Sequence, residues 1–256
     1  AWSGLAARGG AADVGVPVRL VGAPAEVGVV GRLLLLHRGA VVGAQMAMLT
    51  HPGPLDVAEL PIIAAQQIGI HYTGKEAHAS AYPELGINAA DALTVSGIAI
   101  GLLRQHLRAG DRVHGIVTHG GEAPNIVPAH TEAEYIVRGA TVAEFEVIRE
   151  RVIRGLEAGA LATGAILDVL PRHEPYAEMH HHPEIAVAYR RNAESLGRTF
   201  GPFDPRAAAS TDMGNVSLAI PSIHPGIGIG SLPAVNHQPE FAAHRVTPAA
   251  DHALRD

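Results

Sequence analysis

The stretch from Thr131 to Gly159, TEAEYIVRGATVAEFEVIRERVIRGLEAG, joins a strand pattern directly to a helix pattern. Apolar and polar side chains alternate from Thr131 to Arg138, which predicts a strand with one buried face. From Thr141 onward apolar residues recur at helical spacing, and Thr141 with Glu144 matches a capping box. The stretch therefore predicts a half-buried strand followed by an amphipathic helix.

The segments on either side of this stretch extend the pattern into a complete small domain. Further strands are predicted at residues 67–72, 112–118 and 166–170, and a helix at residues 88–106. The resulting order is β-α-β-β-α-β, which is the ferredoxin-like arrangement. We therefore expect a separate α+β domain over residues 68–182.

The flanking segments, residues 1–67 and 183–256, have a different order of predicted strands and helices. Helices are expected at 31–38 and 183–197, and strands at 17–21, 45–49 and 216–220. Strand, loop, helix and strand in succession are typical of an α/β sheet. We therefore expect one discontinuous α/β domain, interrupted by the α+β domain. Ligands of such sheets gather at the carboxyl ends of strands, and Glu26 and His51 each follow a predicted strand.

The composition limits the classes of protein and partner. A net charge of −6, without a basic stripe, argues against nucleic-acid binding. There is no cysteine, which removes disulfides and thiolate metal sites and fits a reducing compartment. No apolar run reaches the ~18 residues of a membrane span. We expect a cytoplasmic protein with no membrane partner.

Carboxylate and imidazole side chains are the candidates for chemistry. Glu26 is either a general base or a solvated loop carboxylate. His51 and His237 suit Zn²⁺, although with 16 histidines in the chain each is also a candidate surface or core residue. The adjacent histidines 180–182 form a rival cluster, but neighbours on a loop rarely point at one ion.

Three motifs in order carry a family resemblance. They are HYTGKEAHASAYP at residues 71–83, GGEAPNIVP at 120–128 and STDMGNVS at 210–217. Together they resemble the M20 family of metallopeptidases and amidohydrolases, within its dipeptidase subgroup. The resemblance implies a zinc-exopeptidase-like α/β domain, interrupted by a lid domain through which two copies form a homodimer. It also implies hydrolysis of an amide bond in dipeptides or N-acyl amino acids.

The same resemblance assigns roles to individual residues. It implies that Glu26 is the general base and that His51 and His237 are ligands of Zn²⁺ or another divalent metal. His78 would polarise the scissile carbonyl in the neighbouring subunit, where an imidazole donor suits a developing oxyanion. The resemblance also implies that Asn125 contacts the substrate near its carbonyl and that Arg138 binds a substrate carboxylate. Arg138 is alternatively a surface ion-pair partner of a neighbouring glutamate.

The chain departs from the family pattern at the metal site. Val27 stands where the family has a carboxylate ligand, and an aliphatic side chain cannot bind a metal. The family's upstream ligand segment would precede Ala1, so we expect a fragment with little activity as given. The alternative is a non-catalytic dimerisation and carboxylate-binding module derived from such an enzyme. Asp212 is a candidate for a turn residue, a residue that orients a metal ligand, or a ligand itself. His224 is a candidate either for orienting a ligand or for packing.

Overall fold

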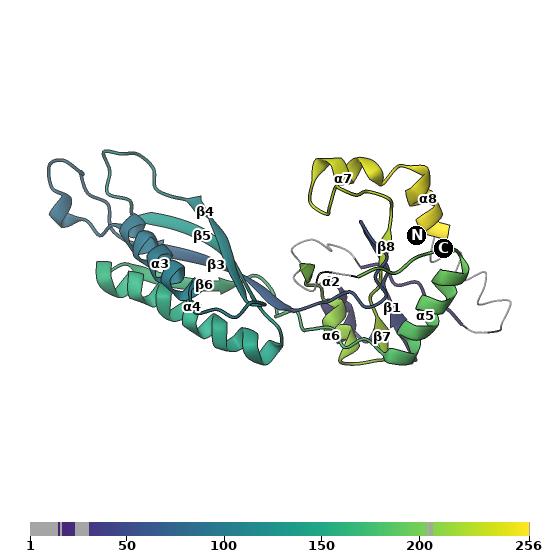
Figure 1. Ribbon diagram of the computed structural model, residues 1–256. Coiled ribbons are helices and arrows are strands. Elements are labelled where there is room, and N and C mark those ends of the chain that lie inside the picture. Colours follow the sequence, from purple (N-terminus) through teal and green to yellow (C-terminus); the bar gives the residue numbers. More distant parts are fainter. Residues whose placement is uncertain (1–14, 16, 24–30, 203, 205–206, 256) are drawn as a thin grey trace. The chain divides into compact units, whose positions relative to one another are not determined.

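The computed structural model describes residues 15, 17–23, 31–202, 204 and 207–255, and Figure 1 shows their arrangement. The chain divides into two compact units. Unit 1 comprises residues 1–62 and 179–256, and unit 2 comprises residues 63–178. Each unit has a hydrophobic core of its own.

Unit 2 is a four-stranded antiparallel sheet with two long helices (Figure 1). Its elements are β3 (Ala64–Thr73), η1 (Pro83–Leu85), α3 (Ala89–Arg104), β4 (Arg112–His119), β5 (His130–Gly139), α4 (Val142–Thr163) and β6 (Ile166–Pro171). The sheet order is β4-β5-β3-β6, and every neighbouring pair is antiparallel. The predicted β-α-β-β-α-β arrangement is confirmed.

Both helices of unit 2 pack on one face of this sheet. Along β5 the side chains alternate between buried and half-buried, as the sequence predicts for a strand covered on one side. The buried set packs with α3 and α4; it includes Ala133, Tyr135 and Val137 from β5, with Phe145 and Val152 from α4. The Tyr72 hydroxyl ties the layers together, because it contacts Ser96 Oγ at 2.5 Å and donates to the Leu156 carbonyl at 2.7 Å. Burial raises the pKa of Tyr72 to about 12.

The start of α4 realises half of the predicted capping box. Thr141 Oγ1 accepts a hydrogen bond from the Glu144 backbone N–H at 3.2 Å, as a helix N-cap should. The Glu144 carboxylate pairs instead with the Arg108 guanidinium, which comes from the loop before β4. The reciprocal contact of the capping box is therefore replaced by a tertiary ion pair.

Unit 1 is built from short elements. These are α2 (Gly31–His37), β1 (Ala47–Met48), β2 (His51–Gly53), α5 (Pro183–Ser195), α6 (Met213–Ser217), β7 (Ser222–Ile223), β8 (Gly226–Gly228), α7 (Pro239–His244) and α8 (Pro248–Arg255). Two parallel pairs, β1 with β7 and β2 with β8, join the N-terminal and C-terminal parts of the chain. This is the parallel pairing that an α/β domain requires.

Two of the predicted strands in unit 1 are wrong, and a third is shorter and more exposed than predicted. Residues 216–220 begin in helix α6, because Met213 and Val216 share a buried helical face and the strand forms only after Pro221. Residues 45–49 contain a two-residue strand, with Met48 58% exposed rather than buried. Residues 17–21 form no regular element. Short apolar runs do not distinguish strand from helix, which explains these errors.

Among the helices that the structure describes, none combines the length and the apolar character needed to cross a membrane.

Candidate functional site

Two segments carrying predicted metal ligands meet in unit 1. His51 lies on β2, and its Nδ1 is 2.8 Å from the Pro52 carbonyl oxygen. Asn236 donates its side-chain amide to the same oxygen at 3.2 Å. Since a carbonyl can only accept, His51 carries its proton on Nδ1, which leaves Nε2 with a free lone pair. An imidazole oriented in this way is prepared for a metal through Nε2.

His237 follows Asn236 directly and has an unusual backbone. Its φ is 70°, and among the described residues it is the single non-glycine with positive φ. Such a conformation is rare outside glycine and turns an exposed side chain away from the path of a regular strand. The structure therefore brings the His51 and His237 segments into contact through Asn236, a residue that the sequence analysis missed. Glu26 and Val27 lie outside the described residues.

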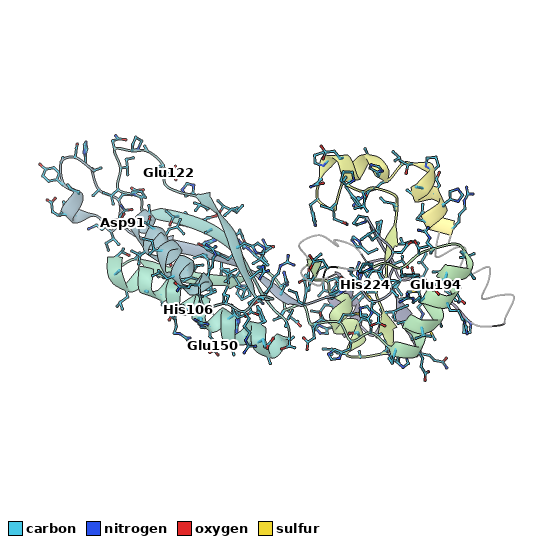
Figure 2. The ribbon with its side chains drawn as sticks, in the orientation of Figure 1. Asp91, His106, Glu122, Glu150, Glu194 and His224 are labelled. Atoms are coloured by element: carbon cyan, nitrogen blue, oxygen red, sulfur yellow. The ribbon has the colours of Figure 1, made fainter. Side chains whose placement is uncertain are left out.

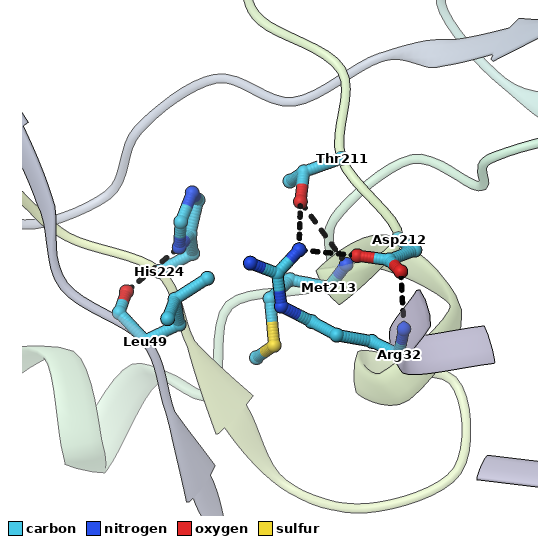
Figure 3. Close-up of polar contacts among 6 residues, drawn as sticks. All are labelled: Arg32, Leu49, Thr211, Asp212, Met213 and His224. Atoms are coloured by element: carbon cyan, nitrogen blue, oxygen red, sulfur yellow. Dashed lines mark hydrogen bonds and ion pairs between the residues drawn. The ribbon is translucent and has the colours of Figure 1, made fainter. Parts of the chain in front are cut away.

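His224 is a buried imidazole beside His51. Its Nδ1 donates to the Leu49 carbonyl at 2.7 Å (Figure 3), and its ring meets the His51 ring edge-on at a centroid distance of 6.0 Å. Burial lowers the pKa of His224 to about 4, with smaller contributions from His51, Arg32 and His181. His224 is therefore neutral at pH 7. Figure 2 shows it inside unit 1, whereas Glu194 lies on helix α5.

The histidines at 180–182 do not converge on one point. His181 Nε2 donates to the Leu60 carbonyl at 2.9 Å, and its Nδ1 faces the His224 backbone N–H at 3.5 Å. His182 occupies the N-cap of α5, and the His180 backbone donates to Ser217. The cluster seen in the sequence therefore serves local structure.

Asp212 is held by Arg32. One carboxylate oxygen accepts from the Arg32 backbone N–H at 2.7 Å, and the other pairs with the Arg32 guanidinium, which also reaches Thr211 Oγ1 (Figure 3). Both partners are mostly buried, with the side chains 14% and 4% exposed for Arg32 and Asp212. Both oxygens of Asp212 are thus used in joining α6 to the start of α2, which is a structural role.

In unit 2 the two motif loops that carry His78 and Asn125 lie against each other. Ala79 N donates to the Asn125 carbonyl at 3.0 Å, and Val127 N donates to the Ala77 carbonyl at 2.9 Å. His78 is exposed, and its Nδ1 accepts a long hydrogen bond from Ser80 N at 3.4 Å. The proton of a neutral His78 is therefore on Nε2, which is available as a donor.

Arg138 lies at the other end of the sheet. β3 ends at Thr73, which pairs with His130 at the start of β5, whereas Arg138 pairs with Ala65 near the start of β3. Eight residues of strand at about 3.3 Å each separate the two ends by ~26 Å. Within one copy of unit 2, a small molecule cannot touch both Arg138 and the His78 loop.

The surroundings of Arg138 are basic. Arg112 is directly opposite it on β4, and burial lowers the pKa of the Arg138 guanidinium. The pKa of His114, on the same strand as Arg112, is lowered by burial and then by Arg138, Arg104 and Arg112. Glu134, an expected ion-pair partner of Arg138, pairs with Arg172, and Glu132 contacts His130. A positive region of this kind attracts a carboxylate.

Comparison with known proteins places this geometry in context. Residues 65–163 match the family described as peptidase dimerisation domain of the M20 type. The chain is 35% identical to the mouse Xaa-Arg dipeptidase over 234 residues, which cover 90% of this chain and 54% of that protein. It is 33% identical to the human Xaa-Arg dipeptidase, over 88% of this chain and 52% of that protein. The chain therefore spans about half the length of these curated relatives.

Two solved structures extend the comparison to the fold. The aminobenzoyl-glutamate utilization protein of Klebsiella pneumoniae superposes with a TM-score of 0.64 at 21% identity, over 80% of this chain and 55% of that one. A dinuclear metal-binding peptidase of Bacillus subtilis superposes with a TM-score of 0.57 at 18% identity, over 91% of this chain and 62% of that one. At these identities the likeness concerns the fold.

Proposed function

We propose that this chain, which belongs to the M20 family of peptidases and amidohydrolases, serves in metal-dependent hydrolysis of an amide bond beside a free carboxylate. The proposed substrates are dipeptides, with C-terminal arginine as the first choice, and N-acyl amino acids. Two names support this range: the mouse relative is an Xaa-Arg dipeptidase, and an Escherichia coli relative is a p-aminobenzoyl-glutamate hydrolase subunit.

The observation that carries the proposal is the shared Pro52 carbonyl. It accepts from both His51 and Asn236, so two distant segments with candidate metal ligands are tied to one backbone atom. The arrangement supports His51 and His237 as a pair of imidazoles assembled for one purpose.

The donor set of unit 1 fits a metal in part. The family resemblance assigns His51 and His237 to different metal positions, so His51 Nε2 and the His237 ring would each hold a divalent ion, and the metal when bound would polarise the scissile carbonyl and lower the pKa of a water molecule. A catalytic zinc usually has three protein ligands. Two imidazoles alone, at different metal positions, are expected to bind metal weakly, which agrees with the valine at position 27.

The other residues are proposed to act on the substrate directly. Glu26 would take a proton from the attacking water and return it to the leaving amine. His78, as the Nε2–H tautomer, would donate to the developing oxyanion. Arg138 would bind the substrate carboxylate, with Asn125 beside the carbonyl.

The length of the sheet supports a homodimer through residues 68–182. His78 and Asn125 are ~26 Å from Arg138 in one copy, so one substrate cannot use all three. Antiparallel pairing of two β4 edges about a two-fold axis would bring the His78 end of one copy beside the Arg138 end of the other. A complete substrate site then needs both copies.

The test uses the protein produced from its complete gene, assayed with free-acid and amidated dipeptides ending in arginine. We expect zinc-dependent hydrolysis of the free acid, and Arg138→Ala should raise KM about 10- to 100-fold, since a charge-assisted pair contributes about 1.5–3 kcal/mol. Glu26→Gln should abolish kcat and leave binding nearly intact. Arg154→Ala, which removes an exposed arginine of helix α4, is the control, with KM near that of the wild type.

Equal hydrolysis of amidated and free-acid dipeptides would remove the carboxylate role of Arg138. Absence of hydrolysis with every substrate, with or without zinc, would favour the non-catalytic binding module.

A further inference from the structure

The sheet of unit 2 has one face that its helices do not cover. Since α3 and α4 pack on the side of Ala133, Tyr135 and Val137, the alternate residues of β5 point to the opposite side. At the end of the sheet where β3 finishes and β5 begins, these residues are a glutamate and a histidine, Glu132 and His130.

The strand register places further histidines beside them. Glu132 is directly opposite His71 on β3 and opposite His119 on β4. A register shift between Val117 and His119 brings His119 to this level, as a β-bulge does. Directly opposed residues of antiparallel strands have Cβ atoms about 4.5–5.5 Å apart, so side chains from three strands meet around Glu132.

The ligand atoms are close to the spacing that one ion needs. Atoms from His71, His130 and Glu132 all lie within 4.8 Å of one another, and His130 Nε2 is 2.8 Å from Glu132 Oε1. The His71 and His119 rings each have a centroid 5.7 Å from that of His130. Ligands at about 2.0–2.2 Å from zinc are at most ~4 Å apart, so small rotations would bring His71, His130 and Glu132 onto one ion. The His119 Nε2 lies 3.1 Å from Glu122 Oε1, and His119 would exchange this contact for the metal.

The chemical types of these side chains suit a transition metal. The hydrogen bond from His130 lowers the pKa of Glu132, and the nearby His71, His130 and His119 add to this. Glu132 is therefore an anionic oxygen ligand at neutral pH. Imidazole and carboxylate together favour zinc and similar transition metals. The next outward carboxylate, Glu134, is occupied by Arg172 and Gln67.

We propose that His71, His130 and Glu132, with His119 as the fourth ligand, form a binding site for a divalent transition-metal ion of the zinc type. No residue of this site is shared with the candidate ligands His51 and His237. Among the described residues, His71, His130 and Glu132 are the one group of three metal-ligating side chains whose ligand atoms all lie within 4.8 Å of one another.

The position of the site gives it a structural consequence. His71 is two residues before the end of β3, which leads into the loop of His78. His119 ends β4, which leads into the loop of Asn125, and Figure 2 shows Glu122 on that loop. An ion here joins the bases of both loops and fixes their spacing, independently of whether the protein hydrolyses amides.

The test measures zinc binding to the 256-residue chain carrying His51→Ala and His237→Ala, so that unit 1 contributes neither candidate ligand. Equilibrium dialysis should find roughly one zinc per chain, and Co²⁺ should give visible absorption of a low-coordinate site. His71→Gln, His130→Gln or Glu132→Gln should weaken binding more than about 100-fold, because losing even a residue behind a ligand costs about 10- to 100-fold. His106→Gln, an exposed histidine of the same unit, is the control.

Zinc bound as tightly by the three variants as by the control would overturn the proposal. The proposal would also be overturned if the chain carrying His51→Ala and His237→Ala bound no zinc at micromolar concentration. The contact between His130 and Glu132 would then be an ordinary surface hydrogen bond. Circular dichroism of each variant separates ligand loss from misfolding. Because the readout is binding in a chain without His51 and His237, failure of the hydrolase proposal leaves this result unchanged.

Discussion

At the residue scale, Asp212 illustrates how one side chain can have three sequence interpretations. Its motif suggested a turn, an orienting residue or a ligand, and the sequence contained no sign of its partner, because Arg32 lies 180 positions away. The motifs predict His51 and His237 as ligands, and this stays a prediction. They do not predict a role for Asn236, because that role depends on a backbone oxygen that only the folded chain brings near.

We expect Asp212→Ala to lower the unfolding free energy by about 3 kcal/mol, because it removes a mostly buried carboxylate that accepts from both the backbone N–H and the guanidinium of Arg32. Urea unfolding measures the change. Glu194→Ala is the matched control, since its pair with Arg190 on α5 is about half exposed, and it should cost under ~0.5 kcal/mol. Equal losses in the two variants would show that the Arg32 pair is worth no more than a surface pair.

The pKa of His114 reports the charge of Arg138. We expect NMR titration to place it below its ordinary value of 6.5, and Arg138→Ala to move it upward by removing one repelling cation. Because the unfolded chain takes up this proton first as the pH falls, His114 reduces stability below pH 6.5 and has no effect above it. Arg149→Ala on α4 is the control, and an unchanged His114 pKa in Arg138→Ala would leave burial, Arg104 and Arg112 as the causes.

At the scale of elements, the sequence predicted unit 2 better than unit 1 for a physical reason. β3 and β5 each have ten residues and α4 has 22, so their periodicity repeats several times. The strands of unit 1 have two or three residues, and their pairing is set by contacts between distant segments. Such strands leave no period to detect.

The contact between α3 and α4 depends on Gly159. A Cβ there would lie 2.2 Å from Ser96 Oγ and 2.3 Å from the Ala92 carbonyl oxygen. We expect Gly159→Ala to destabilise the protein by about 1–3 kcal/mol, as overpacking does, in thermal unfolding.

Gly155, one turn earlier on α4, is the matched comparison. Its Cβ would have its nearest contact at 3.5 Å, so Gly155→Ala should be neutral or stabilise by up to about 1 kcal/mol through helix propensity. If both substitutions act alike, the helices do not meet at Gly159 as closely as the structure has them.

At the scale of the whole molecule, β4 is an open sheet edge with apolar side chains. Ile116 and Val117 on this strand are 67% and 58% exposed. An uncovered edge of this kind invites pairing with another chain. The sequence predicted a domain suited to dimerisation but not which edge would be open, because strand order is a property of the folded sheet.

We expect light scattering to find a dimer at micromolar concentration, and the double variant Ile116→Lys/Val117→Lys to be a monomer, since lysines on an edge oppose pairing. Val187→Lys on α5, at an equally exposed position of unit 1, should remain dimeric. A monomeric parent chain contradicts the dimer, and a dimeric lysine variant places the interface elsewhere.

The Pro52 carbonyl has a consequence for how this protein tolerates mutation. Every amino acid has a backbone carbonyl, so no substitution at position 52 removes the acceptor of His51 and Asn236 as long as β2 stays paired with β8. The orientation of both side chains is therefore encoded in strand pairing rather than in the identity of one residue. Random mutagenesis should find its loss among changes that disrupt the β2–β8 ladder, and seldom among changes to the side chain at position 52.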